Sequence, residues 1–166
     1  MNTPLMVGIC LTLGVAASAA GRAAGAPPLA YPKEAAVAVS DTIHQEVDFT
    51  ASPKRIYDAL LDSKQFTSFA GRPSTIDPKV GGTFSLFGGP IVGMNIELVS
   101  EKRIVQAWRV ATWPEGVYSI ATFTLVARGT GTHLVFDQAG FPPAEHDHLT
   151  AGWSSNYWTP LKAYLK

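Results

Sequence analysis

The sequence is poor in cysteine and has no excess of charge of either sign. Cys10 is the only cysteine in 166 residues, and it lies inside an apolar N-terminal run. If that run is removed, the remaining chain has no disulfide, no thiolate nucleophile and no cysteine metal site. Thirteen lysines and arginines balance thirteen aspartates and glutamates. This balance gives no electrostatic basis for binding an anionic membrane or nucleic acid, so we expect no nucleic-acid partner.

The motifs of several common catalytic sites are also absent. The sequence has no Gly-x-Ser-x-Gly elbow, no His-Glu-x-x-His pair and no phosphate-binding loop. Glu97 and Asp137 fall on expected strands opposite the most apolar faces, so we expect water around them. Gln138 shares a strand face with Phe136, which makes it a candidate polar group in a pocket or a strand-end side chain bonded to backbone. We expect a binding protein rather than an enzyme, and the enzymatic alternative stays open.

The N-terminal segment is typical of an export signal. Residues 1–21 carry no charged side chain, and Leu5 to Ala17 form an apolar run. Small-x-small triplets ending at Ala19 and at Ala26 provide two possible cleavage sites. The run is short and rich in glycine and alanine for a spanning helix. We therefore expect cleavage, export to the periplasm or the outside, and no integral membrane segment in the mature chain. The alternative is an uncleaved anchor.

A change in composition after this signal divides the chain. We assign residues 1–26 to the signal peptide and the start of a linker, and residues 27–41 to an alanine- and proline-rich linker. Residues 42–166 form one expected domain. The chain is 46% hydrophobic and 16% charged, so such a domain can bury a core.

Hydrophobic periodicity in the domain predicts strands joined by short loops. Ser52 and Pro53 start a helix after the first strand, and a second short helix is expected at 63–69. Short gaps such as Gly88-Gly89-Pro90, an ordinary hairpin turn, favour antiparallel neighbours. The predicted fold class is α+β, a curved antiparallel sheet of six or seven strands packed against a long C-terminal helix. The strands are expected at 42–50, 83–87, 91–99, 103–110, 118–127 and 132–138.

The last stretch, residues 144–166, predicts a long helix with one large apolar face. Pro160 lies inside this pattern and lacks the backbone N–H that an interior helical position donates, at a cost of about 3 kcal/mol. Burial of several large side chains, at about 1.5–3 kcal/mol each, outweighs that cost, so we expect one kinked helix. The side chains at helical spacing are Leu149, Trp153, Tyr157, Leu161 and Tyr164.

The order of these elements resembles the helix-grip fold of the START and Bet v 1-like superfamily. Several segments narrow the resemblance to the heat-shock-protein-90 ATPase activator homologues, over about residues 42–166. The segments are Thr50-Ala51-Ser52-Pro53, Val80-Gly81-Gly82-Thr83-Phe84, Ile104-Val105-Gln106-Ala107-Trp108-Arg109, Gly131-Thr132 and Gly152-Trp153. The resemblance implies a helix-grip domain, and in single-domain relatives a ligand cavity under the long helix. It also implies that eukaryotic relatives with an additional N-terminal domain activate the chaperone ATPase.

The aromatic helix and the resemblance together predict a ligand site under the final helix. Tryptophan and tyrosine offer an apolar body and a polar tip that orients a ligand, and the alternative is a packed core. Met94, Ile96 and Leu98 are expected to share one apolar strand face. The candidate ligand-binding residues are Phe84, Met94, Ile96, Trp108, Phe123, Phe136, Gln138, Trp153 and Tyr157.

The run Glu145-His146-Asp147-His148 is the nearest approach to a metal motif. His146 and His148 are two residues apart and do not share a helix face, so we expect no metal and no cofactor. Three functions remain open. The favoured one is binding of a small hydrophobic or amphipathic ligand. The second is a co-chaperone or protein-interaction domain with a chaperone ATPase as partner, and the third is a small-molecule cyclase, dehydratase or hydrolase.

Overall fold

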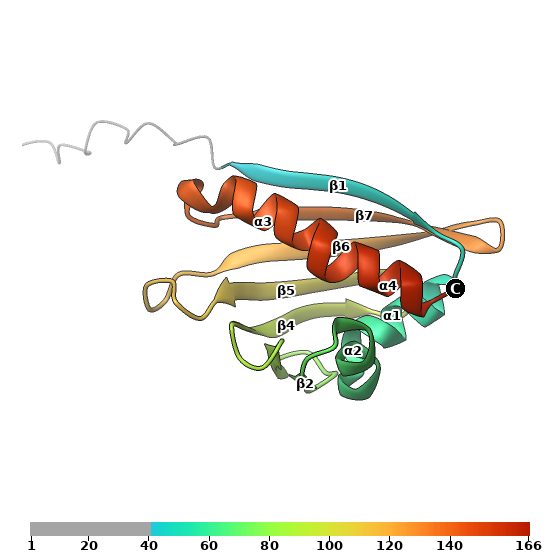
Figure 1. Ribbon diagram of the computed structural model, residues 1–166, viewed down its shortest axis with the longest axis horizontal. Coiled ribbons are helices and arrows are strands. Elements are labelled where there is room, and N and C mark those ends of the chain that lie inside the picture. Colours follow the sequence, from blue (N-terminus) through green and yellow to red (C-terminus); the bar gives the residue numbers. More distant parts are fainter. Residues whose placement is uncertain (1–40) are drawn as a thin grey trace, which may run out of the picture. The chain divides into compact units, whose positions relative to one another are not determined.

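The computed structural model describes residues 41–166, in which a long helix lies across one face of an antiparallel sheet (Figure 1). The predicted signal peptide, both cleavage sites and the linker up to residue 40 lie outside the described residues. None of the helices in the described part is long and apolar enough to cross a membrane.

The sheet has seven strands in the order β1-β7-β6-β5-β4-β3-β2, and every neighbouring pair is antiparallel. Six or seven strands were expected from the sequence, and six of them were assigned residue ranges. The seventh, β2, has only two residues, and two residues are too few to show an alternating pattern. The strands are β1 Thr42–Phe49, β2 Thr75–Ile76, β3 Thr83–Leu86, β4 Ile91–Val99, β5 Arg103–Val110, β6 Ser119–Arg128 and β7 Gly131–Ala139.

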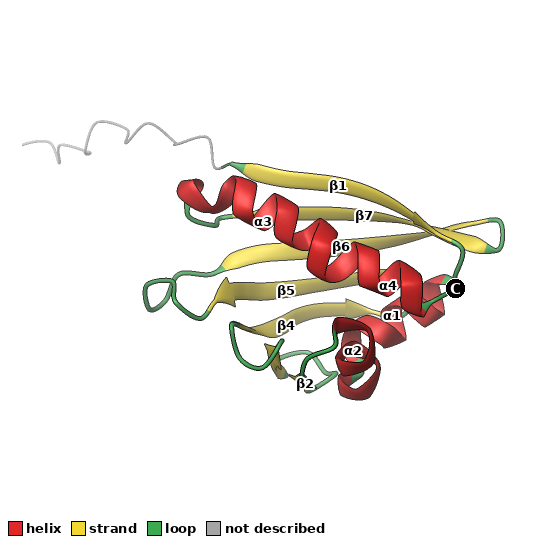
Figure 2. Ribbon diagram, viewed as in Figure 1, coloured by secondary structure: helices red, strands yellow, loops and turns green. Residues whose placement is uncertain are grey.

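Two short helices, α1 (Pro53–Leu61) and α2 (Ser63–Ala70), follow the first strand as the sequence predicts (Figure 2). Ser52 is extended at the N-cap of α1, with Pro53 in the first turn, although the serine side chain makes no capping hydrogen bond. The Asp62 side chain accepts from the Gln65 N–H and caps α2.

The final helix runs without interruption through four segments and is confirmed as one element. They are η1 (Pro143–Glu145), α3 (His146–Trp153), η2 (Ser154–Trp158) and α4 (Thr159–Tyr164). The η2 segment is a π-helix, in which the Thr159 N–H donates to the Ser154 carbonyl five residues earlier. The wide turn directly precedes Pro160, whose missing N–H explains why the ordinary α-helical ladder gives way here.

The extra residue in this π turn changes which side chains face the sheet. Tyr157 and the next residue, Trp158, are both buried, and Leu161 and Leu165 continue the buried face. Tyr164, which the α-helical spacing placed on this face, is 38% exposed instead. Uniform α-helical spacing failed at this residue because the π turn advances the helix phase by one position.

A β-bulge in β4 corrects a second expectation. The pairing of β4 with β5 shifts between Asn95 and Glu97, which leaves Ile96 as the extra residue. Asn95 therefore points into the protein, whereas Met94 and Ile96 are 42% and 43% exposed on the opposite face. The prediction that Met94 and Ile96 face the final helix is wrong, because the alternation assumed an unbroken strand.

Candidate functional site

A cleft of about 250 Å³ opens between the final helix and the β3–β4 hairpin. Side chains from α3 and η2 form one wall, the hairpin and the segment after α2 form the other, and β5 forms the floor. Its lining residues are Arg72, Phe87, Pro90, Ile91, Trp108, Val110, His148, Leu149, Gly152, Trp153, Asn156 and Tyr157. The lining is mostly apolar, with polar groups on four side chains, Arg72, His148, Asn156 and Tyr157, which is the usual make-up of a small-molecule site.

Three of the predicted site residues meet in this cleft, namely Trp108, Trp153 and Tyr157. The Trp108 Nε1–H donates to the Tyr157 hydroxyl oxygen at 3.4 Å. Burial raises the pKa of the Tyr157 hydroxyl far above its usual range, so this group stays protonated. The aromatic floor and the helical wall are thereby joined by a direct hydrogen bond.

Gln138 supports the site from below. Its Oε1 accepts from Trp153 Nε1 at 2.7 Å, and its Nε2 donates to Ser119 Oγ at 2.8 Å. The Ser119 hydroxyl donates in turn to the Trp108 carbonyl at 2.9 Å. This buried chain of side-chain bonds fixes the indole of Trp153, and Gln138 itself does not line the cleft. The sequence left two alternatives for Gln138, a polar group in the pocket or a side chain bonded to backbone. The structure shows neither, because the Gln138 side chain forms hydrogen bonds with two other side chains, Ser119 and Trp153.

Phe87 forms the hairpin side of the cleft in a strained backbone conformation. Its φ of 58° lies in the left-handed region, which costs a non-glycine residue about 1–3 kcal/mol. The ring packs edge-on against Tyr157 at 5.3 Å and against Phe66 at 5.4 Å, and this packing offsets the strain. The Phe87 N–H donates to Ser74 Oγ, so the hairpin is tied to the segment that carries Arg72.

The remaining predicted residues lie elsewhere. Phe84, Phe123 and Phe136 are buried in the core, where the Phe136 and Trp153 rings are 4.2 Å apart. The internal space beside Phe84 and Phe123 measures about 10 Å³, which is at the lower limit for one water molecule and far too small for an organic ligand. For these three residues the alternative of a packed core is the one that the structure supports.

Sequence reasoning missed nine of the twelve lining residues, among them Arg72, Phe87, Ile91 and Val110. Arg72 and Phe87 lie in loops where no periodicity operates. The only usable signal was the Gly88-Gly89-Pro90 turn, whose glycines permit the positive φ angles next to Phe87.

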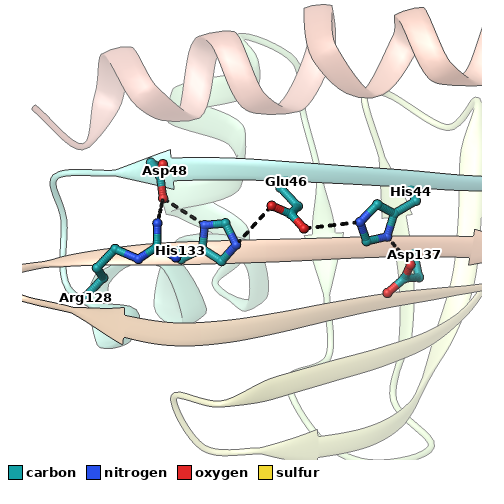
Figure 3. A network of polar contacts seen from close by, with 6 residues as sticks. All are labelled: His44, Glu46, Asp48, Arg128, His133 and Asp137. Carbon is teal, nitrogen blue, oxygen red and sulfur yellow. Dashed lines mark hydrogen bonds and ion pairs between the residues drawn. The ribbon is translucent and has the colours of Figure 1, made fainter.

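A network of charged and histidine side chains, called the polar ladder here, lies on the sheet face that points away from the final helix, over β1 and β7 (Figure 3). Its residues are His44, Glu46, Asp48, Arg128, His133 and Asp137. His44 Nδ1 lies 2.7 Å from Asp137 Oδ1, and its Nε2 lies 3.4 Å from Glu46. His133 contacts Asp48 at 2.8 Å and Glu46 at 3.4 Å. The hydrogen bonds to Asp137 and then to Glu46 raise the pKa of His44, because a neutral imidazole has one N–H for two carboxylates.

Neither this ladder nor the His146 region forms a metal centre. Within residues 41–166, no group of three or more His, Cys, Asp or Glu side chains is arranged to hold an ion. His146 Nδ1 instead contacts its neighbour Asp147 at 3.0 Å.

Comparison with known proteins identifies relatives over most of the domain. A family model described as "Activator of Hsp90 ATPase homolog 1-like protein" matches residues 50–166. The human "Activator of 90 kDa heat shock protein ATPase homolog 1" is 31% identical over 114 residues, which are 69% of this chain and 34% of that protein. A Dictyostelium discoideum homologue is 33% identical over 122 residues, 73% of this chain and 32% of that protein. The chain thus spans about a third of the length of these relatives.

Solved structures agree with the fold. An HSP90 activator from Plasmodium falciparum superimposes with a TM-score of 0.72 at 25% identity, over 75% of this chain and 95% of that one. The Aha1 dimer from Colwellia psychrerythraea gives a TM-score of 0.65 at 20% identity, over 75% of this chain and 96% of that one.

Proposed function

The chain belongs to the family of activator of Hsp90 ATPase homolog 1-like proteins, and on that premise we propose that its domain binds a small hydrophobic or amphipathic molecule in the cleft beside the final helix. The cleft and its three convergent aromatic side chains, Trp108, Trp153 and Tyr157, carry the proposal. Its volume of about 250 Å³ lies just below the 300–1,000 Å³ of typical small-molecule pockets, so the ligand is small.

The cleft offers enough apolar surface to hold such a ligand. Each methylene group that leaves water for an apolar site contributes about 0.8 kcal/mol. The Trp108 indole is held by Tyr157, and the Trp153 indole by Gln138, so both rings are ordered before a ligand arrives. Binding therefore costs little ordering of the protein.

Gly152 allows the cleft to be filled without disturbing the core. It lines the cleft on the final helix, and a Cβ added there meets only the Asn156 side-chain nitrogen, at 3.8 Å. Leucine is also a better helix former than glycine. Gly152→Leu should fill the cleft while the protein stays folded, and Gly152→Ala is the matched control.

Native mass spectrometry of the purified protein tests the proposal, followed by organic extraction of bound material. We expect excess mass that is lost on denaturation, present in the wild type and in Gly152→Ala and absent from Gly152→Leu. An unliganded wild type that also fails to bind small apolar probes in titration contradicts the proposal. So does retention of the bound molecule by Gly152→Leu.

A second proposal rests on the named relatives. We propose that the domain associates with a chaperone ATPase through the outer sheet face, where Met94, Ile96 and Ile120 are exposed. The measurement is ATP turnover of an Hsp90-type ATPase with increasing amounts of this protein. Stimulation that Ile96→Glu abolishes supports the proposal, and unchanged turnover at saturating amounts contradicts it.

We also propose that the N-terminal segment directs export of the chain. The uncharged run from Leu5 to Ala17 and the two small-residue triplets support this proposal. N-terminal sequencing of the protein from its native compartment should give a start just after Ala19 or Ala26. A protein that retains Met1 contradicts cleavage.

A further inference from the structure

The lining of the cleft contains an asymmetry of charge that bears on the ligand's chemical class. We propose that the ligand is an anionic amphipath, with a small apolar body in the cleft and a carboxylate-like group at its rim. The inference rests on the proposed function above. Of the twelve lining residues, Arg72 carries a positive charge, whereas none is an aspartate or glutamate.

Arg72 differs from every other arginine in the described chain. Arg103 and Arg128 pair with carboxylates, at 3.6 Å and 3.4 Å. Arg55 and Arg109 donate to backbone carbonyl groups. The Arg72 guanidinium has no hydrogen bond or ion pair to any residue between 41 and 166, although it lies on the wall of the cleft. Its planar set of five donors matches the two oxygens of a carboxylate.

Hydrogen bonds of the two residues after Arg72 anchor its backbone at this wall. The neighbouring Pro73 carbonyl accepts from the Gly88 N–H at 2.7 Å, and the Ser74 hydroxyl accepts from the Phe87 N–H at 3.1 Å. The segment that carries Arg72 is thus joined to the hairpin that supplies the aromatic wall. A cation whose backbone is anchored beside an apolar cleft is placed to meet the polar end of a molecule whose body lies inside.

The remaining polar groups are able to donate as well. Tyr157 accepts from Trp108 and keeps its own hydroxyl proton, because burial raises its pKa. Asn156 and His148 stand on the helical wall and both carry N–H groups. One N–H of Asn156 donates to the Gly152 carbonyl at 3.1 Å, which leaves its second N–H for a ligand. An amine ligand would meet no carboxylate among the lining residues, and an oxyanion would meet several donors. The small volume favours a medium-chain or single-ring acid over a two-chain lipid.

Titration with three probes of equal chain length tests the inference: octanoate, octanamide and octylammonium. Trp108 and Trp153 line the cleft, so tryptophan fluorescence of the whole protein reports binding. We expect octanoate to bind at least about threefold more tightly than octanamide, and octylammonium to bind most weakly. Added salt should narrow the gap between octanoate and octanamide, since the guanidinium is exposed.

Three variants separate failure of this inference from failure of the proposed function. Arg72→Gln should bring octanoate down to the affinity of octanamide, Arg72→Lys should keep part of the gap, and Gly152→Leu should abolish binding of all probes. Equal affinities for the three probes in the wild type would overturn the anionic class and leave the binding function standing. The anionic class would also be overturned if Arg72→Gln still bound octanoate more tightly than octanamide by the same factor. If no probe binds, both proposals fail.

Discussion

At the scale of single residues, two buried tryptophans differ in whether the indole N–H has a hydrogen-bond acceptor. Trp153 Nε1 donates to Gln138, whereas Trp113 Nε1 is buried with no hydrogen-bond partner in the described residues. An unpaired buried donor is a cost to the folded state, and a paired one leaves its acceptor unsatisfied when it is removed.

Replacing each indole by phenylalanine should reveal this difference. Trp153→Phe leaves Gln138 Oε1 without a donor, so we expect it to lower the free energy of unfolding by about 1–3 kcal/mol more than Trp113→Phe does. Urea denaturation of the two variants measures the difference. Equal losses would show that the Trp153–Gln138 bond contributes little.

Protonation of His44 should make stability depend on pH. Its pKa in the folded protein is raised above 6.5 by Asp137 first and Glu46 second. The folded state therefore binds this proton more tightly than the unfolded chain does. The stabilisation is fully present below pH 6.5 and is lost as pH rises through the folded pKa.

The comparison of wild type with His44→Gln tests this sign. The difference in Tm between the two proteins should be larger at pH 5.5 than at pH 8.5, in favour of the wild type. A difference that is constant with pH, or larger at pH 8.5, would contradict the linkage.

At the scale of elements, one side chain of the first strand forms two hydrogen bonds to the final helix. Gln45 on β1 donates to the Thr150 carbonyl at 3.0 Å and accepts from Trp158 Nε1. Both partners belong to the final helix, and Trp158 reaches this position because of the π turn. The edge strand and the helix are thus fixed to each other.

A double-mutant cycle should measure this contact. We expect Gln45→Leu to destabilise the protein by about 1–3 kcal/mol, because it leaves the buried Trp158 Nε1–H without its acceptor and removes a hydrogen bond to the Thr150 carbonyl. Combined with Trp158→Phe, the loss should be smaller than the sum of the two single losses. If the losses in urea denaturation are additive, the hydrogen bond between Gln45 and Trp158 contributes no coupling free energy.

The same helix contains a glycine that its position does not require. Gly152→Ala should raise the free energy of unfolding by about 0.5–1 kcal/mol, since the added Cβ meets one atom at 3.8 Å. Gly131→Ala is the contrasting variant and should destabilise, because its Cβ would lie 2.3 Å from the Phe49 carbonyl oxygen. Denaturation curves that rank the two variants in the opposite order would contradict this account.

Elements with regular periodicity could be predicted from the sequence, and the corrections occur where the period changes. The strands with long alternating patterns and both short helices were found, with ends within about two residues. Because of the bulge at Ile96, Met94 lies on the exposed face of the sheet and not on the predicted buried face. The π turn before Pro160 likewise moved Tyr164 out of the buried face of the helix. A one-residue insertion leaves no mark in a pattern of hydrophobic residues, so these positions needed the structure.

The candidate site was predictable only in part, for a related reason. Trp108, Trp153 and Tyr157 lie on regular elements, and their spacing brought them together. Arg72 and Phe87 reach the cleft through loop contacts between segments that are not periodic, such as the bond from Gly88 to Pro73. Sequence pattern carries no information about such contacts.

At the scale of the whole molecule, one aromatic core joins the sheet to the final helix. Trp153 is 2% exposed and packs against Phe136 and Tyr157, each with ring centroids 4.2 Å away. The helix has no separate core of its own, so sheet and helix should unfold together.

Trp153→Ala tests this cooperativity. We expect a loss of about 3–5 kcal/mol in the free energy of unfolding, with circular dichroism and fluorescence transitions that still coincide. Separate transitions would show that the helix detaches before the sheet melts. The variant is thus a probe of the core, and the cleft is better tested through Gly152.

The two edge strands of the sheet determine whether sheets of different molecules can pair edge to edge at high protein concentration. One edge is β2, with two residues, too short to template another chain. The other is β1, whose outward side chains include His44, Glu46 and Asp48, in a ladder of charges that a second strand would have to accommodate. With no net charge to keep molecules apart, this arrangement of edges is what opposes fibril-like growth of the sheet from one molecule to the next.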